Sequence, residues 1–153
     1  MIKFDAHLHV GNFERCSEIV FNSEYKNKYR VYSDIQLSLI RGQLEYLSTL
    51  EDFFAIPIIF REINITLENN FINSFCKNFG KGVPVGIINQ FDDSTFQNFK
   101  IWKEHFLVNN YEEFKKRLYI YEYINERNGF IIIHCKDKIR VEYINFLHSK
   151  FPK

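Results

Sequence analysis

Residues 130–134, Phe130-Ile131-Ile132-Ile133-His134, are the most strongly strand-like stretch of this sequence. Four consecutive aromatic or β-branched residues indicate a strand that is buried on both faces, as the strands of parallel sheets are. The apolar run ends in a histidine, and parallel α/β folds present functional side chains at the carboxyl ends of their strands. The stretch therefore predicts a parallel sheet and a functional position at His134.

Further short runs rich in Ile, Val and Phe alternate with longer amphipathic stretches along the chain. This alternation is typical of βα units that build a mostly parallel sheet with flanking helices. Gly129 is expected to end the helix over residues 110–128. Only residues 92–98 separate the third and fourth strands, so either that connection is a short helical turn or one strand is misplaced. The expected strands cover residues 2–10, 53–60, 83–91, 99–108 and 130–134, and the expected helices cover residues 34–50, 66–79, 110–128 and 137–150.

The composition indicates one ordinary globular domain over residues 1–153. Hydrophobic residues make up 46% of the chain and charged residues 25%, which excludes a disordered or collagen-like protein. The net charge of +1 gives no general attraction for nucleic acid or for an anionic membrane. A closed (β/α)₈ barrel typically needs about 250 residues, so a complete barrel is excluded as well.

The cysteines and the first residues predict the compartment. Cys16, Cys76 and Cys135 are far apart and form no CxxC pair, so neither a disulfide framework nor a thiolate zinc site is expected. Asp5 stands where a signal peptide would need an apolar core. Residues 53–59, one of the longest apolar runs, have only about a third of the length that crosses a bilayer. We therefore expect a cytoplasmic protein.

The first expected strand carries the pattern Asp5-Ala6-His7-Leu8-His9. Residues two apart in a strand project from the same face, so His7 and His9 are expected side by side, where two imidazoles can chelate a divalent ion. Asp5 falls on the same face by this spacing and could accept a hydrogen bond from an imidazole N–H. The alternative is that both histidines are tolerated polar residues of a strand.

The fourth expected strand contains Lys103-Glu104-His105. Lys103 and His105 share one face by alternation, and Glu104 takes the other. A lysine ammonium is unfavourable beside a cation, whereas a carboxylated lysine is a good anionic ligand. The alternative is that these three residues form a solvated edge.

Other catalytic signatures are not found. The sequence has no G-x-S-x-G elbow, Walker loop, G-x-G-x-x-G or HExxH motif. Cys135 follows His134 directly and is expected to face the opposite way, which disfavours a Cys-His catalytic pair. His148 falls in the last expected helix, near Lys150, and is expected at the surface without a role.

Three of these motifs together resemble a known family. Residues 4–11 (Phe-Asp-Ala-His-Leu-His-Val-Gly) resemble the opening strand of the amidohydrolase superfamily, the TIM-barrel metal-dependent hydrolases that include the TatD-like branch. Residues 101–105 are similar to its lysine-x-histidine strand, residues 130–135 to its fifth-strand histidine motif, and Phe151-Pro152 to the helix end before its sixth strand. The resemblance implies a partial TIM-barrel-like α/β fold, with the first five of eight strands and flanking helices.

The resemblance also implies a metal centre and a reaction. One or two divalent ions, usually zinc, would be held by His7, His9, Lys103 and His134, with His105 as a further candidate ligand. Water activated by the metal would attack a C–N, C–O or P–O bond of a small-molecule substrate. The family's sixth-strand histidine and eighth-strand aspartate have no counterpart in these 153 residues. Asp137 is the candidate stand-in for the missing general base.

Two other functions remain open. A PHP-type phosphoesterase also opens with an Asp-x-His-x-His strand, although Lys103-x-His105 favours the amidohydrolase interpretation. The chain could also be a non-catalytic remnant or a metal-binding module of the same fold. A half barrel exposes two sheet edges, so we expect a homo-oligomer or a partner chain that completes the barrel.

Overall fold

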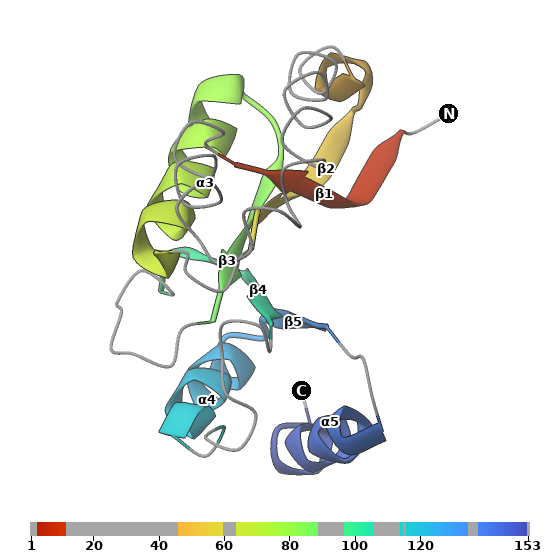
Figure 1. Ribbon diagram of the computed structural model, residues 1–153, viewed down its shortest axis with the longest axis vertical. Coiled ribbons are helices and arrows are strands. Elements are labelled where there is room, and N and C mark those ends of the chain that lie inside the picture. Colours follow the sequence, from red (N-terminus) through yellow and green to blue (C-terminus); the bar gives the residue numbers. More distant parts are fainter. Residues whose placement is uncertain are drawn as a thin grey trace, which may run out of the picture.

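The computed structural model describes residues 3–11, 46–59, 64–88, 97–105, 114, 116–134 and 138–152. Strands and helices alternate over most of this part of the chain (Figure 1). The elements are, in order, β1 (Phe4–Val10), β2 (Asp52–Pro57), α3 (Ile65–Phe79), β3 (Val83–Ile87), β4 (Ile101–Glu104), α4 (Leu118–Glu126), β5 (Phe130–Ile133) and α5 (Lys138–Lys150).

The five strands form one parallel sheet whose order in space, β1-β2-β3-β4-β5, is their order in the sequence. The sheet curls into a half barrel, and α3, α4 and α5 flank it (Figure 1). The predicted α/β class and partial barrel are therefore confirmed. In the described part of the sheet, β1 and β5 are the two edge strands.

Helix α3 agrees most closely with its predicted range. The side chain of Asn64 caps its first turn by accepting a hydrogen bond from the N–H of Leu67 at 3.1 Å. Gly80 ends it in the left-handed conformation, with a φ of 76°. Ile72 and Cys76 lie on its inner face and are buried.

Helix α4 differs from its prediction at both ends. It begins at Leu118, whereas the start predicted at residue 110 lies outside the described residues. At the other end Asn128, with a φ of 50°, is the left-handed residue, so the terminator stands one position before Gly129. Gly129 is needed for a different reason, because a Cβ at that position would overlap Trp102.

The strands are shorter than predicted. Strand β2 ends at Pro57, β3 at Ile87 and β4 at Glu104. Both strands that flank residues 92–98 are present and pair in parallel, and residues 97 and 98 form a short 3₁₀ turn. Of the helix predicted over residues 34–50, only 46–50 are described, and residues 46–49 are helical.

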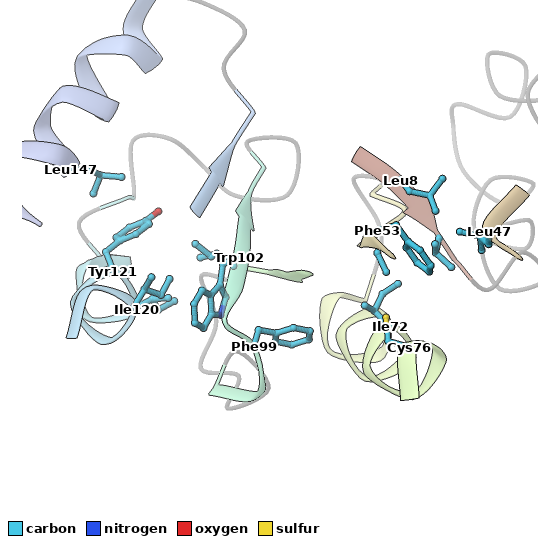
Figure 2. Packing of buried hydrophobic residues seen from close by; sticks show 14 of the residues in the cluster. Leu8, Leu47, Phe53, Ile72, Cys76, Phe99, Trp102, Ile120, Tyr121 and Leu147 are labelled. Carbon is cyan, nitrogen blue, oxygen red and sulfur yellow. The ribbon is translucent and has the colours of Figure 1, made fainter. Parts of the chain in front are cut away.

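Alternate strand residues form two clusters of buried side chains. The larger cluster joins the sheet to the helices, and Figure 2 shows Phe53 of β2 pointing toward Ile72 and Cys76 of α3. The smaller cluster, which includes Ile56 and Val85, lies on the opposite face of the sheet. In the part of the chain that is described, no helix combines the length and apolar content needed to cross a membrane.

Candidate metal centre

A β-bulge in β1 shapes the first part of the site. Asp5 is in register with Phe53 and Leu8 with Ala55, so β1 has one residue more than β2 over this interval. Such bulges bend a strand and redirect its side chains. The Asp5 carboxylate accepts hydrogen bonds from the main-chain N–H of His7 at 2.9 Å and from the Tyr46 hydroxyl at 3.3 Å.

The bulge changes the role predicted for Asp5. Its register partner Phe53 belongs to the helix-side cluster, whereas Ile56, the partner of His9, belongs to the opposite cluster. The strict alternation from which Asp5 was placed on the histidine face is therefore broken. Its carboxylate braces the backbone of the bulge, which corrects the expectation that it would bind an imidazole N–H.

The two histidines of β1 converge through the same ring nitrogen. Nε2 of His7 and Nε2 of His9 are 3.3 Å apart. Nδ1 of His9 donates a hydrogen bond to the carbonyl of Pro57 at 2.9 Å, which fixes the tautomer and leaves the Nε2 lone pair directed at the shared point. The main-chain carbonyl of β2 thus performs the orienting role that the sequence assigned to Asp5.

Lys103 of β4 completes a triangle of nitrogen atoms with these histidines. Its Nζ lies 3.3 Å from Nε2 of His7 and 3.5 Å from Nε2 of His9. The side chain is only 1% exposed, and the whole stretch 101–105 is buried, so the predicted alternative of a solvated edge is wrong. The same spacing allows Lys103 to donate a hydrogen bond to an unprotonated imidazole.

Burial shifts all three groups toward their unprotonated forms. Desolvation, followed by the positive charges of Lys103, His7 and His134, lowers the pKa of His9 to about 4, against the opposing effect of the Pro57 carbonyl. Desolvation and Lys103 lower the pKa of His7, and desolvation lowers the pKa of Lys103. Metal ligation requires unprotonated nitrogen, so the electrostatics of the site favour it.

His105 and His134 form a second pair beside the triangle. Their ring centroids are 4.5 Å apart, with His105 buried and His134 exposed. His134 lies close enough to His9 for its charge to lower the pKa of His9. Among the described residues no three His, Cys, Asp or Glu side chains are grouped to hold one ion, so the third nitrogen beside His7 and His9 comes from Lys103. Asp137 lies outside the described residues.

Sequence reasoning missed a buried polar network behind the site. Glu104 faces the helices, as alternation predicts, and its carboxylate accepts a hydrogen bond from the Tyr121 hydroxyl and lies 3.5 Å from Nε of Arg117. The hydroxyls of Tyr121 and Tyr143 are 2.5 Å apart. Burial and the charge of Glu104 raise the pKa of both tyrosines, so they remain protonated donors.

The network could not be read from the sequence because its members come from β4, α4, α5 and the residue before α4. Each tyrosine fits a helical apolar stripe and gives no sign of a carboxylate opposite. The only usable signal was Glu104 itself, an acid placed by alternation on the helix side of a strand.

His148 is exposed on α5, as expected.

The carboxyl ends of β1 and β4 thus bring together two imidazoles and a buried amine, with a second histidine pair alongside. Such a set of nitrogen donors can hold a divalent ion. In comparisons of the chain with known proteins, no family model, no curated protein and no solved structure matches it.

Proposed function

We propose that this protein is a metal-dependent hydrolase of the amidohydrolase type, with its centre at His7, His9 and Lys103. The observation that carries the proposal is the nitrogen triangle, whose sides are 3.3, 3.3 and 3.5 Å. Ligands bound tetrahedrally to zinc at about 2.0–2.1 Å stand about 3.3–3.4 Å from each other. The residues present therefore fit a zinc-sized ion, and one or two ions are proposed, with His105 and His134 as the further candidate ligands.

Each residue of the site would offer one ligand atom to the ion. His9 is held in one tautomer by Pro57 and offers Nε2, and His7 offers the same atom from the bulge. The Lys103 amine can add to carbon dioxide, forming an N–C bond and releasing a proton, so that it becomes a carbamate anion, one of whose oxygens would then replace Nζ as the ligand. Its lowered pKa favours the neutral amine that this addition requires. When bound, the ion would lower the pKa of a coordinated water toward about 7, the form of nucleophile that hydrolysis needs.

We propose a small-molecule substrate with a hydrolysable C–N, C–O or P–O bond and retain Asp137 as the candidate general base. A cytoplasmic setting is proposed from the scattered cysteines. A PHP-type centre relies on further carboxylate ligands, and the described site supplies a lysine instead, which favours the amidohydrolase type. The second candidate function is a metal-binding module without turnover. It is favoured by the lack, within the described residues, of a third His, Cys, Asp or Glu ligand.

The metal centre is tested by zinc binding to protein purified without a chelator. We expect near-stoichiometric zinc by elemental analysis, and His7→Ala and His9→Ala are each expected to weaken binding at least about 100-fold, since each removes one of the converging nitrogens. His134→Ala tests the neighbouring pair. Saturating zinc at about 100 times Kd should stabilise the wild type by about 2.7 kcal/mol.

His148→Ala, an exposed histidine on α5, is the matched control and should bind zinc as the wild type does. Retention of the metal in both the His7→Ala and His9→Ala variants would rule the centre out. A screen of phosphate esters, amides and lactones with added zinc or manganese then separates the two functions. Turnover that is lost in Lys103→Met supports the hydrolase, whereas bound metal without turnover supports the binding module.

A further inference from the structure

A pocket of about 530 Å³ lies at the amino ends of β4 and β5, away from the carboxyl ends that carry the candidate metal centre. Its walls come from the residues that lead into β4, from the last turn of α4 and from the start of β5. Sites for small organic molecules enclose about 300–1,000 Å³ and combine apolar walls with a few polar groups. This pocket has that size, and neither the metal centre nor the buried Glu104 network uses it.

The inner wall of the pocket is aromatic and rigidly packed. Trp102, only 1% exposed, and Phe99 are part of the buried core, and Figure 2 shows Trp102 between β4 and α4. The Trp102 ring meets Tyr123 edge to face, with centroids 6.5 Å apart. Gly129 lets the indole lie directly against the chain, since any Cβ there would overlap it. A flat apolar group would therefore meet a preformed surface.

The mouth of the pocket is positively charged. Arg127 lies over the Tyr123 ring, 3.6 Å from its centroid, and Lys100 is exposed at the start of β4. Both cations line the pocket, and none of the described residues that line it carries a carboxylate. Glu126 reaches Arg127 at 3.8 Å, but both side chains are more than half exposed. An exposed pair of this kind contributes about 0–1 kcal/mol, so an incoming anion can compete with it.

We propose that this pocket binds a small organic anion that carries an aromatic ring. Its carboxylate or phosphate group would be held by Arg127 and Lys100, because a guanidinium matches the geometry of such anions. Its ring would lie against Phe130, beside the buried Trp102, and Phe130 at 69% exposed is the most exposed large apolar side chain in the described part of the protein. The proposal does not depend on the metal centre.

The single tryptophan of the chain provides the readout. In ¹⁵N-labelled full-length protein, Trp102 gives one indole N–H resonance, which can be followed during titration. Phenyl phosphate and phenylacetate are the aromatic anions, and their comparison separates phosphate from carboxylate. Benzylammonium has the same ring with the opposite charge, and inorganic phosphate has the charge without the ring. At least one aromatic anion should shift the resonance to saturation, with both controls binding at least about tenfold more weakly.

Variants then assign the contacts. Arg127→Gln should raise the Kd of the aromatic anion about tenfold, since one charge-assisted hydrogen-bonded contact is lost. Lys77→Gln, an exposed lysine on α3, should leave the Kd unchanged, and so should His7→Ala, because the metal centre is not involved. Arg127 is largely exposed, so its variant is expected to fold, and a thermal melt checks this. Equal binding of benzylammonium, no saturation by either aromatic anion, or an unchanged Kd in Arg127→Gln would overturn the proposal.

Discussion

Glu104 connects the candidate metal centre to the helices that support it. Its side chain, fully buried, contacts Arg117 and Tyr121, while its neighbour Lys103 faces the histidines. Its main-chain carbonyl accepts a hydrogen bond from the N–H of His134 at 3.1 Å. One residue thus anchors the end of β4 on one face and positions functional side chains on the other.

We predict that Glu104→Gln lowers the free energy of unfolding by about 3–5 kcal/mol, because the Arg117 guanidinium then remains buried without its counter-charge. Urea denaturation followed by circular dichroism measures the change. Glu122→Gln, at an exposed acid on α4, is the control and should stay within about 0.5 kcal/mol of the wild type. Equal small effects in the two variants would show that the buried pair contributes no net stability.

For single residues, the sequence predicts the face of a strand on which a side chain lies better than it predicts what that side chain contacts. The spacing of His7, His9 and Lys103 was enough to nominate them, because alternation along a strand is a local property. The role of Asp5 was mistaken because the bulge depends on how β1 pairs with β2. The sequence of β1 alone does not determine that pairing. The partners of Glu104 were missed because they come from three other parts of the chain.

The buried side chain of Asn69 joins helix α3 to strand β3. It forms the backbone hydrogen bonds that β2 would otherwise form with the end of β3. The pairing of β3 with β2 ends at Pro84, and Ile87, the last residue of β3, is instead bound by Asn69 of α3. The Asn69 amide donates to the carbonyl of Ile87 at 3.1 Å and accepts from its N–H at 2.8 Å. Both backbone groups are thereby satisfied within the protein.

Asn69→Ala should therefore destabilise the fold by about 2–4 kcal/mol, since it leaves two buried backbone groups of Ile87 unpaired. Asn70→Ala, one position along α3 at an exposed side chain, is the matched control. Thermal unfolding of the two variants measures the difference. If both lose equally little stability, water replaces the amide and β3 does not depend on α3 at this point.

Elements were predictable where their signals are local and not where they depend on neighbours. Apolar runs located all five strands, and the helical spacing of apolar residues located α3 almost to the residue. Strand ends were overestimated because Ile, Val and Phe continue past the last ladder bond, as at β2 and β3. The end of α4 was misplaced because Gly129 is required by Trp102 and not by the turn itself.

The whole molecule presents two sheet edges, β1 and β5, in its described part. Each edge begins with an exposed aromatic residue, Phe4 on β1 and Phe130 on β5. Edge strands with unpaired backbone groups and apolar side chains favour pairing with another chain. We therefore propose a homo-oligomer in which one copy covers the open edge of another, with a separate partner chain as the alternative.

Light scattering coupled to gel filtration should accordingly give a mass above that of one 18.5 kDa chain. Phe130→Lys places a charge on the β5 edge and should shift the protein toward the monomer, with a circular dichroism spectrum that stays like that of the wild type. Leu67→Lys, at an exposed leucine on α3, should leave the mass unchanged. A monomeric wild type at all concentrations would contradict the proposed self-association.

The strands have the same order in space as in the sequence, and this affects the order in which the protein can fold. Each strand pairs with the strand made just before it, so no strand has to wait for a later one to reach its partner. A chain leaving the ribosome can add these units one after another. The nitrogens of the candidate metal centre are an exception, because Lys103 stands 96 residues after His7. Much of the sheet can therefore fold before Lys103 reaches His7 and His9. Metal binding would then be a late step in the folding of the protein.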